Sequence, residues 1–340
     1  MTQIAVIDWD QQELRTVVGD VRRGALRAAV CSVVAWEEAE QQGLEAGTLP
    51  AVEALLERAN VKRMPAVLLA RRHDLEVLHW LAPPAADEEL PPMVENFVAS
   101  DLGLGTEDAA FDYWTLDDEE NVSRYVAITA MENGQLDLYR QMAEKLHLRK
   151  PRLSVRACGA ASFLRTVAAD ASQPTMVVAP SVEELDVAMV YEGRLAYWRS
   201  AYCSPTGDSA AFHSFVAAEV SRTLAVAEDH LPSNVRIESI SVCAAADEHR
   251  SIMDLLQRTL ELPVNRLPAE LEEVDLEYRG DGELPGRFAP LLGTLAAAAE
   301  GQRPPVDLFN PPTPKRASAI RRPQLLGGLA LIMLLAVAAY

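Results

Sequence analysis

The first residues of the chain whose types and spacing could do chemistry are two carboxylates, Asp8 and Asp10, just after an apolar run at residues 4–7. We read this run as a strand, so the two carboxylates stand at the turn of a hairpin. Carboxylate oxygens at a turn could hold a divalent cation. They could also cap the turn by accepting hydrogen bonds from backbone N–H groups. We favour the cap, and the sequence predicts no metal site.

Other catalytic signatures are missing from the sequence. It has no Gly-x-Ser-x-Gly nucleophile elbow, no P-loop and no complete Gly-x-Gly-x-x-Gly dinucleotide turn. The six histidines form no metal-spaced pair, and the acidic stretch at 269–283 is read as a solvated loop rather than a cation site. The four cysteines lie far apart without a Cys-x-x-Cys pair, which is typical of reduced thiols: Cys31, Cys158, Cys203 and Cys243.

The composition limits the kind of protein. The chain has 340 residues, 49% of them hydrophobic, which is enough for about two domains or one large bilobed unit with buried cores. Its 31 Lys and Arg against 50 Asp and Glu give a net charge of −19. Binding to nucleic acid phosphates needs a basic surface, so this acidity argues against nucleic acid as a partner.

Hydrophobic periodicity predicts a mixed series of strands and helices with a break at residues 172–174. Before the break, the strands are 4–8, 14–19, 25–34, 65–70, 75–81, 109–116, 124–130 and 152–156, and the helices are 51–59, 88–101, 133–146 and 158–169. After it, the strands are 175–179, 185–191, 194–200, 237–243 and a short one from 263, and the helices are 210–229, 247–261 and 287–300. This order is typical of an α/β protein.

The chain repeats one supersecondary unit. Residues 4–34 and residues 175–200 each begin with a strand, turn sharply and continue with two antiparallel strands, and helices and further strands follow. Two such α/β lobes on either side of a cleft describe the ATPase fold shared by actin, Hsp70 and the sugar kinases. The sequence therefore predicts a bilobed actin-like α/β fold.

Several segments, taken in order, resemble the PilM-type actin-like proteins of type IV pilus assembly and the related GspL-type proteins of type II secretion. They are IAVIDWDQQELRTVVG, FDYWTLDDEENVSRYVAITA, LSVRACGAASFLR, VAMVYEGRLAYWRS, SVCAAADEHRSIMDLLQRTLELPV and PLLGTLAAAAEGQRPPVDLFNPP. The resemblance covers residues 1–312 and rests on the order and spacing of the segments. It implies a first lobe at 1–174 with an inserted small subdomain near 84–150, a second lobe at 175–286, and a helix at 287–302 that returns to the first lobe.

The resemblance also indicates where a nucleotide would bind. ATP-binding members use an Asp-x-Gly turn in each hairpin and a Gly-Gly turn near the adenosine, because backbone amides must approach the phosphates closely. Here the three turns read Asp8-Trp9-Asp10, Ala179-Pro180-Ser181 and Ala244-Ala245. Asp10 adds a negative charge and Pro180 lacks a backbone N–H, so phosphate binding is weakened at both hairpins. We expect a pseudo-ATPase without a cofactor; an active ATPase that binds ATP and magnesium is the alternative.

The segment Val306-Asp307-Leu308-Phe309-Asn310-Pro311 resembles the Ile-Asn-Leu-Leu-Pro motif of PilN-type proteins, which inserts into a groove on the PilM-type partner. The chain thus looks like a PilM-type domain fused to a PilN-type N-terminal segment, or like the GspL-type design of a cytoplasmic domain followed by a membrane span. An apolar peptide bounded by prolines loses little conformational entropy when it enters a groove. We predict that Val306, Leu308 and Phe309, within a basic linker at 303–324, dock onto the chain's own first lobe. A linker with incidental apolar residues is the alternative.

The C-terminal residues 325–340 carry no charge, and between 303 and 322 five Lys or Arg stand against one Asp. Basic residues beside an apolar run are typical of the cytoplasmic flank of a membrane span, and they can contact anionic lipid headgroups. We predict that 325–340 is a transmembrane segment, truncated at Tyr340, that anchors a cytoplasmic domain in the bacterial inner membrane. A buried C-terminal helix, or a scaffold without a membrane link, is the alternative.

These interpretations together predict a structural protein rather than an enzyme. It would connect a cytoplasmic motor ATPase with the inner-membrane assembly proteins of a pilus or of a secretion system, and it could form a homodimer. The sequence does not distinguish between the pilus and the secretion system.

Overall fold

A computed structural model describes residues 2–10, 13–35, 56, 61–103, 108–116, 122–168, 172–181, 184–202, 210–231, 235–244, 249–267, 271, 274–279 and 285–311. The predicted helix 51–59 lies outside these residues apart from Leu56, and so do Ala245 and the predicted transmembrane segment 325–340. Within the described ranges, no helix combines the length and the apolar character that a membrane span requires.

The first lobe is built on a six-stranded sheet with the order β14-β3-β2-β1-β4-β8. Its strands are β1 (Thr2–Trp9), β2 (Glu13–Arg22), β3 (Ala25–Ala35), β4 (Pro65–Ala70), β8 (Arg149–Val155) and β14 (Asp275–Arg279). The first three form an antiparallel meander, and β4 and β8 continue the sheet parallel to β1. Parallel neighbours need a long crossover connection, and the small subdomain lies in the connection from β4 to β8.

The second lobe repeats this arrangement in a five-stranded sheet with the order β11-β10-β9-β12-β13. Its strands are β9 (Thr175–Pro180), β10 (Glu184–Tyr191), β11 (Arg194–Tyr202), β12 (Ser239–Cys243) and β13 (Val264–Leu267). Again the first three are antiparallel and the last two parallel. Asp8 pairs with Arg15 in the first hairpin, and Ala179 pairs with Asp186 at the same place in the second. The predicted repeat is therefore confirmed, including the register of the two hairpins.

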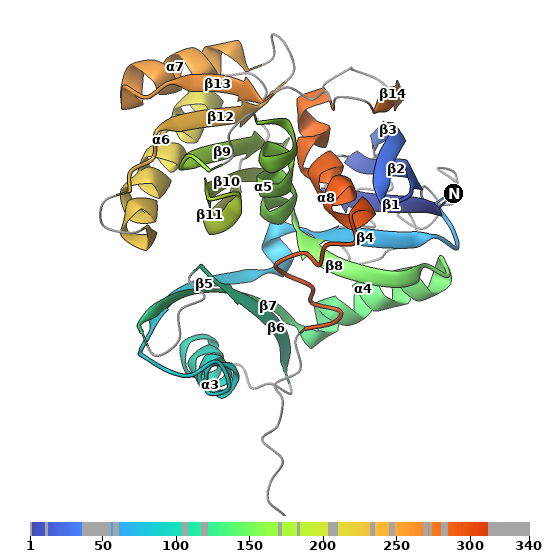
Figure 1. Cartoon of the computed structure of the whole chain (residues 1–340), viewed down its shortest axis with the longest axis horizontal. Coiled ribbons are helices and arrows are strands. Elements are labelled where there is room, and N and C mark those ends of the chain that lie inside the picture. Colours follow the sequence, from blue (N-terminus) through green and yellow to red (C-terminus); the bar gives the residue numbers. More distant parts are fainter. Residues whose placement is uncertain are drawn as a thin grey trace, which may run out of the picture.

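A three-stranded antiparallel sheet with the order β5-β7-β6 forms the small subdomain. Its elements are β5 (Glu76–Ala82), α3 (Leu90–Leu102), β6 (Ala109–Thr115) and β7 (Arg124–Glu132), and the apolar face of α3 packs on the sheet. This unit lies apart from the two large sheets in Figure 1. It spans 76–132, whereas the sequence suggested about 84–150. The following helix, α4 (Asn133–Lys145), and β8 pack into the core of the first lobe instead.

Two helices, α5 (Arg156–Val167) and α8 (Ala289–Ala299), lie between the two large sheets (Figure 1). Their backbones approach closely because each helix carries a glycine at the crossing. A Cβ atom on Gly159 would lie 2.0 Å from the carbonyl oxygen of Pro290, and one on Gly293 would lie 2.1 Å from the carbonyl oxygen of Gly159. Two more helices, α6 (Ala210–Ala227) and α7 (Arg250–Leu260), cover the second sheet. The glycines thus let α8 reach both α5 and the first sheet.

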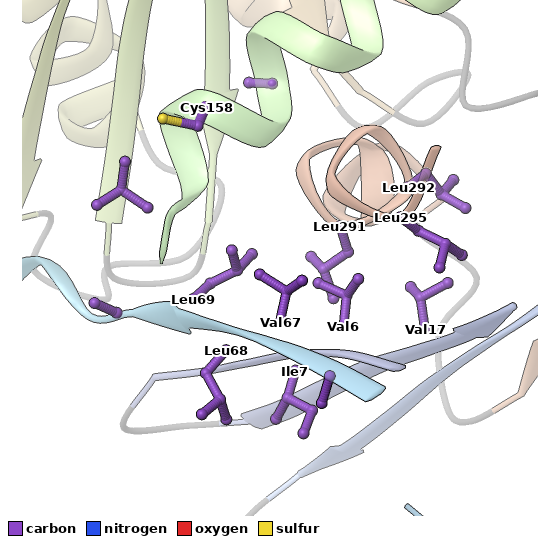
Figure 2. Close-up of a cluster of buried hydrophobic side chains, with 14 of the residues drawn as sticks. Val6, Ile7, Val17, Val67, Leu68, Leu69, Cys158, Leu291, Leu292 and Leu295 are labelled. Carbon is purple, nitrogen blue, oxygen red and sulfur yellow. The ribbon is translucent and has the colours of Figure 1, made fainter. Parts of the chain in front are cut away.

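Strand alternation explains the core of the first lobe. In Figure 2, Val6 and Val67 point from the sheet toward Leu291 of α8, whereas Ile7 and Leu68 point to the opposite face. All five side chains are buried. Successive strand residues point to opposite faces, so both faces of this sheet are apolar. Such a pattern is typical of a sheet that is covered on both sides.

One predicted loop is a strand. The acidic stretch 269–283 contains β14, which runs parallel to β3 at the edge of the first sheet. Leu276 and Tyr278 pack against the core of the first lobe, and the charged residues that alternate with them are exposed. The loop prediction was wrong here because the high charge concealed a two-residue alternation that fits an edge strand. The predicted boundaries also place this stretch in the second lobe, whereas β14 belongs to the sheet of the first lobe.

Candidate functional site

The two equivalent hairpin turns face each other between the lobes. The backbone N–H of Asp10 donates to the carbonyl of Glu13 at 3.1 Å, and that of Ser181 donates to the carbonyl of Glu184 at 2.7 Å. The Ser181 hydroxyl also donates to the carboxylate of Asp10 at 3.1 Å, across 171 residues of sequence. The other carboxylate oxygen of Asp10 accepts the N–H of Glu13 at 2.9 Å. Asp10 therefore caps its own turn and joins it to the turn of the second lobe.

Arg15 fills the space between these turns. Its guanidinium group forms ion pairs with Asp8 at 2.9 Å, Asp10 at 3.0 Å and Glu13 at 3.1 Å, and it donates to the Ser181 hydroxyl at 2.7 Å. The side chain is 1% exposed. Burial lowers the pKa of Arg15, but the surrounding carboxylates, Asp8 first, raise it further, so that the net pKa lies above the usual value. The carboxylates predicted at the first turn are thus paired with an arginine of the same hairpin.

Arg156, the first residue of α5, makes the second bridge. Its guanidinium group binds Asp8 of the first lobe at 2.8 Å and Asp186 of the second lobe at 2.9 Å. The Ser200 hydroxyl donates to the other oxygen of Asp186. Burial raises the pKa of Asp186, and Arg156 opposes this shift. Because all three charged side chains are almost fully buried, this bridge holds the two lobes together in a region shielded from water.

Further contacts extend the bridge. In the turn after β4, the backbone N–H of Arg72 donates to the carboxylate of Glu184 at 2.9 Å, and its side chain donates to the carbonyl of Ser200 at 3.0 Å. Arg287, from the segment before α8, pairs with Glu13 at 2.6 Å. Burial, followed by repulsion from Asp186, raises the pKa of Glu184 to about 8. Four separate chain segments therefore converge on the two hairpin turns.

We call this group the arginine cluster; it comprises Asp8, Asp10, Glu13, Arg15, Arg156, Ser181, Glu184 and Asp186. Its carboxylates are engaged by guanidinium, hydroxyl and backbone N–H groups of the chain itself. In the part of the chain that the structure describes, no three His, Cys, Asp or Glu side chains gather as metal ligands. Among the described residues, two buried donors, Nε of Arg15 and Nη2 of Arg156, find no hydrogen-bond partner. A water molecule or a small anion at these donors would complete the cluster.

The third predicted turn is also covered. Ala244 directly follows β12 and is 2% exposed. The short helical turn Pro285–Phe288 packs on it so closely that a Cβ atom on Gly286 would lie 2.3–2.5 Å from backbone atoms of Ala244. The backbone of Gly286 therefore lies directly against Ala244, where the resemblance places the turn near the adenosine. Ala245, the second residue of this turn, lies outside the described residues.

Residues 303–311, which we call the tail, lie in a groove between the first lobe and the small subdomain. Val306 and Leu308 are fully buried in the first-lobe core. The N–H of Leu308 donates to the carbonyl of Leu153 on β8 at 2.8 Å, and the Asp307 carboxylate accepts the N–H of Leu153 at 3.3 Å. Phe309 is half-buried against the same core, and Pro311 is also half-buried. The structure thus places the predicted apolar residues on the chain's own first lobe.

A buried carboxyl group of the small subdomain holds the tail from the other side. Asp112 on β6 accepts the N–H of Asp307 at 2.8 Å and the N–H of Tyr113 at 2.8 Å. Burial raises the pKa of Asp112 to about 7, although the two N–H groups act in the opposite direction. The backbone N–H of Asp307 and its side chain therefore contact two different units, and the tail connects β6 of the small subdomain with β8 of the first lobe.

Comparison with known proteins supports the fold. No protein-family profile matches the chain, and no curated protein matches it. Among solved structures, a PilM–PilN type IV pilus biogenesis complex aligns with a TM-score of 0.63 and 15% identity, over 87% of this chain and 98% of that chain. The cytoplasmic domain of EpsL, an inner-membrane component of the type II secretion system of Vibrio cholerae, aligns with a TM-score of 0.51 and 10% identity, over 91% and 98% of the two chains.

The chain has the actin-like fold. The duplicated sheet topology and both structural likenesses point to it, and the resemblance to PilM-type and GspL-type proteins is borne out as a likeness of fold. At these levels of identity, the similarity extends to the fold alone.

Sequence reasoning missed the two arginines of the site and the carboxylate of the second lobe that pairs with one of them. Arg15, Arg156 and Asp186 stand in or beside strongly apolar strands, LRTVVG, LSVR and LDVAMVY, where a charged side chain is expensive to bury without a partner. That signal marks each residue as one that must be paired inside the protein. The sequence alone does not reveal which carboxylate meets which arginine, because Arg156 and Asp8 are far apart along the chain.

Proposed function

We propose that the chain is a structural adaptor of an inner-membrane platform that assembles a type IV pilus or a type II secretion system, and that its cleft does not bind nucleotide. The observation that carries this proposal is the arginine cluster at the two turns that bind phosphates in ATP-binding actin-like proteins. Asp8 forms ion pairs with Arg15 and Arg156, and Asp10 forms one with Arg15. Gly286 packs directly against Ala244. Asp10 and Pro180 stand where close backbone approach would be needed.

Energetics favour the closed cleft. Breaking a buried ion pair costs about 3–5 kcal/mol, and a nucleotide would have to break at least the Arg15–Asp10 and Arg156–Asp8 pairs to reach the turns. Because the two pairs are joined through the Arg15–Asp8 pair, their costs do not simply add, but each is a large part of the binding free energy of a micromolar ligand, about 8 kcal/mol. A nucleotide would recover part of this through new contacts with the arginines, but the turns offer it few backbone donors.

The docked tail supports the adaptor role. The solved relative with a TM-score of 0.63 is described as a complex of PilM with PilN. In this chain a PilN-like segment already occupies its own groove through Val306, Leu308 and Asp307. We propose that this contact fixes the folded domain next to the membrane, with 325–340 as the anchor and the domain in the cytoplasm. Inner-membrane assembly proteins and a cytoplasmic motor ATPase are the proposed partners.

Calorimetry with ATP and magnesium on the purified full chain tests the cleft. We expect no measurable heat of binding and no shift of the unfolding temperature in 1 mM ATP. A site with a dissociation constant of about 10 μM would instead stabilise the protein by about 2.7 kcal/mol under these conditions. Such a shift would refute the pseudo-ATPase proposal and leave the adaptor role open.

Cross-linking in native membranes tests the adaptor role separately. A photoreactive residue at an exposed position of the small subdomain, Leu81, should capture an inner-membrane assembly protein or the motor ATPase. A matched residue at exposed Val226 of the second lobe reports whether capture depends on the face. Recovery of the whole chain in the soluble fraction, with no captured protein of either kind, would contradict the proposal.

An ATP-binding actin-like ATPase in the same machinery is the second candidate. The two unpartnered donors of Arg15 and Arg156 favour it, because guanidinium groups bind phosphate oxygens well. The calorimetric experiment decides between a cleft that binds nucleotide, which this candidate requires, and a cleft that does not, which the pseudo-ATPase proposal requires.

A further inference from the structure

The lysines of this chain are concentrated in one place. The chain has 31 basic residues, but four of them are lysines: Lys62, Lys145, Lys150 and Lys315. The first three are exposed on one edge of the first lobe, around the turns before β4 and β8. Lys315 follows the docked tail after Pro311. In a protein with a net charge of −19, compact and strongly hydrated ammonium groups are thus confined to one edge and to the linker that continues from it.

The backbone of this edge is unusual. Two turns are joined by hydrogen bonds, from the N–H of Arg63 to the carbonyl of Leu146 at 3.1 Å and from the N–H of Arg149 to the carbonyl of Met64 at 2.9 Å. Arg63 has φ 60°, His147 φ 51° and Lys150 φ 48°, all in the left-handed region. Glycine would adopt this conformation at lower cost. Basic side chains nevertheless occupy all three positions, and strain of this kind collects at functional surfaces.

The basic side chains line two adjoining hollows. We call the group the basic edge; it consists of Lys62, Arg63, Arg149, Lys150, Arg152 and Arg303. Lys62, Arg63, Arg149 and Lys150 surround one hollow, and Lys150, Arg152 and Arg303 line a groove of about 990 Å³ between α4 and β8.

Two of these arginines bond to neutral oxygens. Arg152 donates to the carbonyl of Gln302 at 2.9 Å, and Arg303 donates to the carbonyl of Asn310. Few carboxylates that reach the surface line the two hollows: Glu144, which is exposed, in the groove, and Asp20, which is half-buried, in the other hollow. The edge therefore presents an excess of positive charge to whatever lies against it.

The position of the docked tail indicates what the basic edge faces. Phe309 and Asn310 line the same groove, so the chain leaves the folded domain beside the basic edge. From Pro311 to residue 325, where the charge-free run begins, an extended chain spans at most about 50 Å. The linker adds four more basic residues, Lys315, Arg316, Arg321 and Arg322. If the run is a membrane anchor, as proposed above, this tether holds the basic edge within reach of the cytoplasmic lipid headgroups.

We propose that the basic edge binds the anionic phospholipid headgroups of the cytoplasmic leaflet and thereby fixes the orientation of the domain on the membrane. Anionic lipids attract clusters of Lys and Arg next to a span, and the contact is screened by salt over about 10 Å. This inference rests on the proposed membrane anchor, but the lipid contact and the anchor can be tested apart. The opposite lobe, with its acidic surroundings, would face the cytoplasm and stay open to partners.

Lysine acylation read by mass spectrometry tests the contact, because two of the four lysines, Lys62 and Lys150, belong to the basic edge. The full chain is reconstituted in nanodiscs of phosphatidylcholine alone or with about one third phosphatidylglycerol. The variant Arg258→Lys places a control lysine on the exposed face of α7 in the second lobe. We expect acylation of Lys62 and Lys150 to slow at least fivefold in the anionic discs and to recover in 0.5 M salt, while the control lysine reacts at the same rate in both.

A charge-reversal pair sharpens the result. Arg149→Glu with Arg152→Glu should abolish the protection, whereas Arg250→Glu with Arg258→Glu on α7 should leave it unchanged. Equal acylation of Lys62 and Lys150 in both kinds of disc would overturn the proposal, as would protection that appears only after an acidic partner protein is added. If the chain does not co-elute with neutral discs, the anchor fails instead. The same lysines are then compared with and without anionic vesicles, and equal rates again overturn the lipid contact.

Discussion

Removing Arg156 should destabilise the protein strongly, because this side chain links the two lobes. In Arg156→Met, Asp8 keeps its pair with Arg15 at 2.9 Å, but Asp186 loses the guanidinium group that binds it and keeps only the hydrogen bond from the Ser200 hydroxyl among the described contacts of its carboxylate. Loss of one partner from a buried pair costs about 3–5 kcal/mol. For a chain of this size, 1 kcal/mol shifts the unfolding temperature by about 2–4 °C. We therefore expect the midpoint of thermal unfolding, followed by circular dichroism, to fall by roughly 6–20 °C.

A second variant separates the ion pair from the loss of packing. Arg156→Met with Asp186→Asn removes both charges, and buried pairs replaced on both sides are often close to neutral. The double variant should therefore recover more than half of the lost stability. The exposed Arg258→Met serves as the control and should change the midpoint by less than 2 °C. A drop below 2 °C in the single variant, or a double variant no more stable than the single one, would refute the reasoning that the pair holds the lobes together.

Three further changes test other parts of the structure. Leu308→Ala should cost about 2–5 kcal/mol of the free energy of unfolding, since the side chain is fully buried, and exposed Leu81→Ala should cost almost nothing in the same denaturant titration. Gly159→Ala should lower the unfolding temperature because its Cβ would meet the carbonyl of Pro290, whereas Gly134→Ala on α4 meets nothing within 4 Å and should be neutral or stabilising; equal effects would contradict the helix crossing. Burial, followed by repulsion from His230, lowers the pKa of His79 from 6.5 to about 3. The unfolded chain therefore takes up a proton below pH 6.5 while the folded protein does not, and stability should fall between pH 6.5 and 3. His79→Phe should flatten that part of the profile, and an unchanged profile would argue against a buried neutral histidine.

The sequence predicted the repeated part of the fold well. The two hairpins were found because each is a run of apolar strands with tight turns, a pattern that depends on local spacing. The strands at 65–70 and 175–179 and the helix at 133–146 lie within one residue of the observed ends. Counting along the second hairpin identifies Ala179, Pro180 and Ser181 as the equivalents of the first turn, and the strand register agrees with this equivalence.

The misses have physical reasons. The sequence predicts a loop at β14 because most residues of this stretch are charged, and the apolar alternation is limited to Leu276 and Tyr278. The small subdomain begins earlier than expected because β5 pairs with β7. Glu76 lies opposite Ala130, 130 − 76 = 54 residues later in the chain, and a local pattern cannot detect such a partner. The arginine cluster depends on contacts such as Arg156 with Asp8, which lie 148 residues apart. A local pattern carries no information about such partners.

The contacts between the three units support a rigid domain rather than one that opens and closes. Buried pairs of Arg15 and Arg156 connect the first lobe with the second. The tail connects the first lobe with the small subdomain, and the rings of His79 and His230, 5.5 Å apart, connect the small subdomain with the second lobe. A nucleotide-driven protein needs at least one of these boundaries to be weak, because domain closure must cost little. Each boundary here contains polar or aromatic contacts that would have to break, so a force applied at the basic edge would be passed to the second lobe without a change in shape.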